Sequence, residues 1–292
     1  MKIKPLIVFI LVAMPLKALA ADITELRHRL ETAAKPREAY PLWLEYGAAL
    51  DAASDYAGAI DAYKNAVKAL PKKTEGHMAL AMEYEKAELF SQAASEYISA
   101  LERDPKLSLA LMRLASLYLR EGFTSKAMEC YIRALTLRPD TDTYRQTARC
   151  AEKMGNLSLA ASMLRQALSK ESVYDDNLDM GRVLLLSGDN KESERYLSEA
   201  VKLNPRMPDA YLVLGLLYEK MNNYILAEKM LQIAHEKAPD EGLINFFLAQ
   251  LYYHQHNRPK ALAEIAIART HAKTQMLKDY SGKFEGMLEG QR

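Results

Sequence analysis

The fold of this chain is decided by two stretches that lie 34 residues apart, FSQAASEYISALERDP at residues 90–105 and TSKAMECYIRALTLRP at residues 124–139. Both place alanine, tyrosine, alanine and proline at the same positions, which are Ala93, Tyr97, Ala100 and Pro105 in the first and Ala127, Tyr131, Ala134 and Pro139 in the second. Spacings of three and four residues put the small and aromatic side chains on one face of a helix. The proline then ends that helix. Recurrence at a fixed period indicates a repeat architecture.

The same pattern recurs on both sides of these stretches. The further copies are Ala59, Tyr63, Ala66 and Pro71; Ala160, Leu164 and Ala167; Ser193, Leu197, Ala200 and Pro205; Ala227, Leu231, Ala234 and Pro239; and Ala261, Ile265 and Ala268. A second pattern of small and aromatic residues precedes each copy, and its best example is Tyr211, Leu214, Gly215 and Tyr218. Each repeat therefore consists of two amphipathic helices whose small residues let the helix axes approach closely. Gly122, Gly155, Gly188 and Asn222 lie between the halves, where a left-handed residue is needed to end the first helix.

This pattern resembles the tetratricopeptide repeat family over about residues 40–275. Seven copies are predicted, at residues 40–73, 74–107, 108–140, 141–173, 174–207, 208–241 and 242–275. The resemblance implies an all-α, right-handed solenoid of helix–turn–helix repeats with flanking helices. Copy four is irregular, because Ser172 stands where the proline belongs.

The ends of the chain read differently from the repeats. Residues 1–20 have a basic start, an apolar run from Leu6 to Met14 and a small-residue cleavage pattern that ends at Ala20, which together predict a secretory signal peptide. We expect a mature protein that is periplasmic or secreted and is not inserted in a membrane. Residues 21–39 predict an N-terminal flanking helix. Residues 276–292 predict a C-terminal capping helix or tail, with Leu277, Tyr280, Phe284 and Leu288 on one face.

Composition excludes several classes of function. The chain has 292 residues, and 39 Lys and Arg nearly balance 38 Asp and Glu, so a polycation built for nucleic acid is not expected. The two cysteines, Cys130 in copy three and Cys150 in copy four, lie on neighbouring helices. An oxidising compartment would permit a disulfide between them, and two small buried thiols are the other interpretation.

Catalytic motifs are absent from the sequence. There is no H-E-x-x-H, G-x-S-x-G, G-x-x-x-x-G-K or G-x-G-x-x-G pattern, and no span outside the repeats is long enough for a catalytic domain. His254 and His256 form a close pair, but residues two apart do not share a helix face, so we interpret them as solvated residues near a turn. We therefore expect no enzyme activity, no cofactor and no metal.

The candidate binding surface follows from the resemblance, because the first helix of each repeat lines the concave surface in this family. Transferring those positions predicts a basic section followed by an apolar one, made of Arg113, Arg145, Gln146, Arg149, Arg182, Leu212, Leu216, Phe246 and Phe247. Such a groove suits a peptide or helix that carries carboxylates beside apolar anchors. The alternatives are that the arginines are solvated or paired with neighbouring carboxylates, and that the two phenylalanines pack on the C-terminal helix. We expect alanine at Arg145 and Arg149 to weaken binding with little loss of folding stability.

Two functions fit these observations. The first is a non-catalytic periplasmic scaffold or adaptor that binds a protein or peptide partner, as an accessory factor of an envelope assembly such as a pilus, secretion or export system. The second is a periplasmic holdase chaperone for unfolded or apolar client segments, for which the methionines at the start of the groove are suited.

Overall fold

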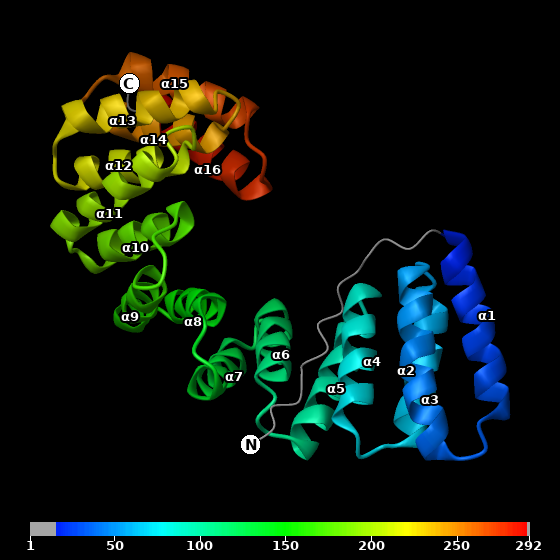
Figure 1. The fold of residues 1–292 in the computed structure, drawn as a ribbon. Helices are drawn as coiled ribbons and strands as arrows, with labels where there is room; N and C mark the ends of the chain where they lie inside the picture. The colour runs from blue at the N-terminus through cyan, green and yellow to red at the C-terminus, as the bar shows by residue number, and fades with distance from the viewer. Residues whose placement is uncertain (1–15, 291–292) are drawn as a thin grey trace. The chain divides into compact units, whose positions relative to one another are not determined.

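The computed structural model describes residues 16–290, and this part of the chain contains sixteen α-helices and no strand (Figure 1). In chain order the helices are α1 (Leu16–Thr32), α2 (Pro36–Ala52), α3 (Tyr56–Ala69), α4 (Thr74–Lys86), α5 (Phe90–Arg103), α6 (Ser108–Arg120), α7 (Thr124–Leu137), α8 (Thr141–Lys153), α9 (Leu157–Leu168), α10 (Tyr174–Ser187), α11 (Asn190–Leu203), α12 (Asp209–Lys220), α13 (Tyr224–Lys237), α14 (Gly242–His254), α15 (Arg258–Thr270) and α16 (Gln275–Gly290). Most of the predicted signal peptide lies outside the described residues.

The chain divides into two compact units, Met1–Arg138 and Pro139–Arg292. In the first unit α1 packs on α2, and the pairs α2–α3, α4–α5 and α6–α7 stack in order. In the second unit the pairs α8–α9, α10–α11, α12–α13 and α14–α15 stack in the same way, and α16 packs on α15. Each helix contacts mainly its neighbours along the chain, which is the arrangement of a repeat solenoid. The predicted all-α repeat fold is confirmed.

Close approach between the two helices of a pair explains the small residues in the pattern. Ala93 and Ala100 on α5 are completely buried, as is Tyr97 between them. A Cβ atom added to Gly181 on α10 would lie 2.5 Å from Leu197 Cγ on α11, and one added to Gly215 on α12 would lie 2.6 Å from Leu231 Cγ on α13. Glycine on the first helix is therefore matched to a large residue on the second.

The turns inside the pairs also follow the sequence. Gly122, Gly155, Gly188 and Asn222 all adopt positive φ, as predicted. The equivalent turns of other pairs use non-glycine residues in the same conformation, which are Ser54, Glu88 and His256. Positive φ is energetically unfavourable for residues that carry a Cβ atom, but these turns adopt it because their geometry requires it.

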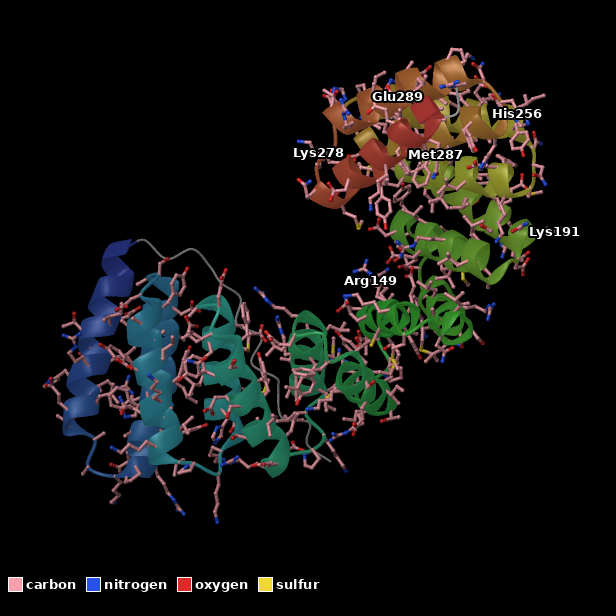
Figure 2. All side chains as sticks on the ribbon, turned by 180° about the vertical axis from the view of Figure 1, so that it is seen from behind. Arg149, Lys191, His256, Lys278, Met287 and Glu289 are labelled. Atoms are coloured by element: carbon pink, nitrogen blue, oxygen red, sulfur yellow. The ribbon has the colours of Figure 1, made fainter. Side chains whose placement is uncertain are left out.

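The flanking helices differ from the prediction in detail. Pro36 lies inside the range 21–39 predicted for the flanking helix, but α1 ends at Thr32 and Pro36 is the first residue of α2, a position where proline is favoured because its missing N–H would have no helical partner. At the other end, Leu288 is buried and Phe284 packs against the core, but Tyr280 is 56% exposed. Figure 2 shows Lys278, Met287 and Glu289 along the same helix, α16. Among residues 16–290, no helix is both long and apolar enough to cross a membrane.

Candidate functional site

The predicted groove residues all lie on the first helices of their pairs. Arg113 is on α6 in the first unit, and the others are in the second unit, on α8, α10, α12 and α14. Their place on first helices agrees with the positions that the resemblance predicted, and their contact with a partner stays a prediction.

The arginines of this set are held in ion pairs with carboxylates on neighbouring first helices. In the first unit Arg113 lies 3.4 Å from Glu85. In the second unit three pairs join α8 and α10: Arg145 with Asp176 at 2.7 Å, Arg149 with Asp179 at 3.7 Å, and Arg182 with Glu152 at 3.0 Å. Arg182 also pairs with Asp179 of its own helix at 3.0 Å. Figure 2 shows Arg149 projecting from α8. These pairs therefore tie copies four and five together.

The Arg145–Asp176 contact is the strongest of these pairs. Arg145 Nε donates to Asp176 Oδ1 at 2.7 Å and Nη2 donates to Oδ2 at 2.9 Å, so the contact is bidentate. The Asp176 side chain is only 2% exposed, and that of Arg145 is 28% exposed. The hydrogen bonds to Asp176 raise the pKa of the Arg145 guanidinium. Asp179 differs, because burial raises the pKa of its carboxyl and outweighs the opposing effect of Arg182 and Arg149.

Pairing changes the electrostatics that the sequence suggested. On α8 and α10, Arg145, Arg149 and Arg182 face the carboxylates of Glu152, Asp176 and Asp179, so the section that was expected to be basic is electrically balanced. For Arg145 the geometry replaces the expectation of little stability loss by an expectation of a large one, because its removal would leave a buried carboxylate without a cation. The role of these residues and of the half-buried Gln146 in partner binding stays a prediction.

The apolar residues of the set divide into two groups. Leu212, Phe246 and Phe247 are partly buried against the C-terminal core. Phe246 is 6.1 Å from the ring of Phe284 on α16 and 5.8 Å from that of Phe247, so the alternative of packing on the C-terminal helix applies to Phe246. Leu216 instead lines a hollow between α12 and α14.

This hollow has a volume of about 640 Å³ and opens to solvent. Its walls come from the ends of α12 and α14 and from the turns that follow them, and its lining residues are Leu216, Glu219, Lys220, Asn222, Tyr224, Tyr253, His254 and His256. One leucine and two tyrosines thus lie beside charged and polar groups in one open hollow. We call this feature the α12–α14 hollow.

A polar pair closes one side of the α12–α14 hollow. His254 Nδ1 lies 2.8 Å from Glu219 Oε1. Burial raises the pKa of Glu219, and the hydrogen bond with His254 opposes that effect. Lys220 Nζ donates to the carbonyl of Leu185 at 2.6 Å, so its position is also fixed. The sequence interpretation of His254 as simply solvated missed this contact, although residues 219 and 254 are about one repeat period apart and the period could have revealed it.

Both cysteines are buried thiols in the structure. Burial raises the pKa of each thiol, which disfavours the reactive thiolate. A disulfide between Cys130 and Cys150 and two buried thiols, the two interpretations that the sequence left open, remain to be separated by thiol titration. Within the described part of the chain, no group of three or more His, Cys, Asp or Glu side chains is arranged to hold a metal ion.

Sequence comparisons match parts of the chain. A tetratricopeptide repeat family profile matches residues 78–142 and 178–224. The UDP-N-acetylglucosamine–peptide N-acetylglucosaminyltransferase of Giardia intestinalis is 35% identical over 51 residues, which are 18% of this chain and 3% of that enzyme. The chain thus corresponds to a small fraction of the transferase.

Structural comparisons cover most of the chain. PilW, a widely conserved type IV pilus biogenesis factor, is 20% identical and superimposes with a TM-score of 0.60 over 71% of this chain and 97% of its own. A tetratricopeptide repeat protein from Parabacteroides merdae is 18% identical, with a TM-score of 0.63 over 86% of this chain and 98% of its own. Identities this low establish the fold alone. The profile matches, the stacked helix pairs and these neighbours agree that the chain contains tetratricopeptide repeats and has the fold of proteins built from them.

Proposed function

We propose that this protein is a non-catalytic interaction scaffold that binds a segment of a partner protein at the α12–α14 hollow. The observation that carries the proposal is the lining of this hollow, where Leu216 and Tyr253 present apolar surface beside the Glu219–His254 pair. A segment with an apolar anchor and a polar neighbour would fill it. The fold supports this function, because solenoids present extended surfaces for such segments.

The N-terminal sequence and the similarity in fold to PilW support a more specific role. The N-terminal pattern in residues 1–20 supports export to the periplasm. The similarity in fold to PilW supports an accessory role in an envelope assembly of the pilus, secretion or export type. N-terminal sequencing of the protein from the envelope fraction tests the first point, because a terminus at Ala21 is expected and an intact Met1 would contradict export with cleavage.

A holdase chaperone is the second candidate, favoured by methionines in the first unit. Met82 on α4 is 36% exposed, and Met78 and Met112 are only partly buried. Flexible thioether side chains adapt to varied apolar clients. This surface is separate from the α12–α14 hollow, so the two candidate functions can be tested independently.

Site-specific photo-crosslinking in intact cells tests the scaffold proposal. A photoreactive residue at position 216 should yield one adduct of defined mass. The matched control is the same residue at Leu203, an apolar position on α11 that is 43% exposed and does not line the hollow. A broad ladder of adducts at position 216 would favour the chaperone. Equal labelling at both positions, or no adduct at either, would contradict binding at the hollow.

A further inference from the structure

The second helix of each pair is preceded by an N-cap residue. All seven N-caps share one backbone conformation, with φ between −96° and −80° and ψ between 61° and 74°. In five pairs the side chain accepts a hydrogen bond from the helix, and these residues are Asp55, Asn156, Asp189, Asn223 and Asn257. In the other two pairs the N-cap is Leu89 or Phe123, and no side chain caps the helix.

Neither Leu89 nor Phe123 makes the capping hydrogen bond that the other five N-caps make. Asp, Asn, Ser and Thr are favoured at N-caps because they satisfy a backbone N–H that otherwise lacks a helical partner. Burial does not replace that benefit, since Leu89 is 38% exposed and Phe123 is 53% exposed. Positions that depart from a local rule tend to mark functional or strained sites.

The two exceptions lie in the turns of neighbouring pairs of the first unit, α4–α5 and α6–α7. The Arg120 guanidinium, at the end of α6, lies 3.5 Å from the ring centre of Phe90, the residue after Leu89. Phe123 packs edge-on against Tyr118, with ring centres 6.3 Å apart. The Lys126 ammonium lies 5.1 Å from the Phe123 ring centre and 5.6 Å from that of Tyr118. We call this surface the turn patch, defined by Leu89, Phe90, Tyr118, Arg120, Phe123 and Lys126.

The charges of the turn patch indicate what it recognises. Arg120 and Lys126 lie over aromatic rings, and neither forms an ion pair with any residue that the structure describes, whereas Arg113 on the same helix as Arg120 is paired with Glu85. Glu88 and Glu121 occupy the same two turns but pair with neither cation, so both cations keep their hydrogen-bond donors available. A cation beside exposed apolar surface complements a carboxylate beside an apolar side chain.

We propose that the turn patch is a second docking surface, which binds an acidic protein segment that carries Leu or Phe side chains beside Glu or Asp. The apolar side chain packs between Leu89 and Phe123, and the carboxylates meet Arg120 and Lys126. This surface lies in the first unit and shares no residue with the α12–α14 hollow of the second unit.

The test uses a defined probe and substitutions that restore the missing caps. The probe is a fluorescein-labelled, acetylated and amidated peptide, Glu-Leu-Glu-Glu-Phe-Leu-Glu, and its charge-reversed counterpart carries Lys in place of every Glu. Fluorescence anisotropy with the full chain should show saturable binding of the acidic peptide alone, weakened by added salt. Leu89→Asn and Phe123→Asn should each weaken binding about tenfold, which corresponds to about 1.4 kcal/mol.

Folding stability separates a lost contact from a damaged fold. Leu89→Asn restores a cap in a backbone that already accepts Asn elsewhere, so its melting temperature should rise by about 2–4 °C. Phe123→Asn also loses the contact with Tyr118, so its melting temperature should change little. The control is Ile225→Asn, which removes an 82% exposed apolar side chain in the second unit and should leave binding unchanged.

Three outcomes would overturn the proposal. One is equal binding of both peptides, or of neither. Another is affinity that Leu89→Asn and Phe123→Asn leave unaltered. The third is binding to vesicles of anionic phosphatidylglycerol without binding to the acidic peptide, which would make the turn patch a lipid-binding surface.

Discussion

Replacing Arg145 by alanine is expected to destabilise the second unit strongly. The substitution removes both hydrogen bonds to Asp176, whose side chain is 2% exposed, and leaves that carboxylate without its cation. Breaking a fully buried pair costs about 3–5 kcal/mol. Two features reduce this cost: 28% of the Arg145 side chain is exposed, and Asp176 lies in the first turn of α10, where the helix dipole favours a negative charge. We therefore expect a loss in the free energy of unfolding at the lower end of the range, about 3 kcal/mol.

Urea and thermal unfolding followed by circular dichroism measure this effect. A loss of about 3 kcal/mol should lower the melting temperature by about 6–12 °C in a unit of this size. The matched control is Arg149→Ala, four residues along the same helix. Its side chain is 52% exposed and its only ion pair spans 3.7 Å, so its loss should cost less than about 1 kcal/mol.

A second substitution isolates the reason for the effect. In Arg145→Ala with Asp176→Asn the buried charge is gone, so most of the lost stability should return. An Arg145→Ala variant that is no less stable than Arg149→Ala would refute the reasoning. The result also bears on partner binding, because any loss of affinity in a variant that lacks Arg145 has to be separated from loss of the fold.

Three further predictions follow from the packing and the titrating groups. In urea unfolding, Gly181→Ala should lower the free energy of unfolding by about 1–3 kcal/mol, because the added Cβ meets Leu197 Cγ at 2.5 Å. Gly282→Ala on α16 has open space around the added Cβ and should raise the free energy of unfolding by about 0.5–1 kcal/mol. Equal effects of the two substitutions would contradict the close approach of α10 and α11. Thiol titration should find two thiols in the unfolded, unreduced protein and slow reaction in the folded one, since burial raises the pKa of Cys130 and Cys150; no thiols on unfolding would instead establish the disulfide. His254→Ala should raise the pKa of Glu219 further, as read from its carboxyl ¹³C shift, because burial already raises it and His254 opposes that. A raised pKa means that the folded state holds the Glu219 proton more tightly than the unfolded state does. The stability that this proton contributes is therefore lost as the pH rises through the folded pKa, and the loss extends to higher pH in the variant. An unchanged Glu219 pKa in His254→Ala would show that the contact is not formed in solution.

For the candidate site residues, the sequence predicted the helix on which each one lies but not the partners of its side chain. The repeat pattern placed Arg145, Arg149 and Arg182 on first helices, and the structure has them there. It did not indicate that Asp176 and Asp179 would be their partners, because the contact joins residues about one repeat apart whose side-chain directions depend on how the pairs stack. Leu216 and Phe246 illustrate the same limit, since both are apolar first-helix residues and only Leu216 lines the hollow.

The sequence by itself determined the helix pairs, their period and the turn positions that need positive φ, such as Gly122 and Asn222. These features depend on interactions within one repeat, which recur in each copy and therefore leave a periodic signal. Only the tertiary structure decided which charges are neutralised, where the α12–α14 hollow opens and that the side chains of Leu89 and Phe123, at N-cap positions, stay exposed. Those properties arise between repeats, where the side chains differ from copy to copy and burial and distance set the energy of each contact.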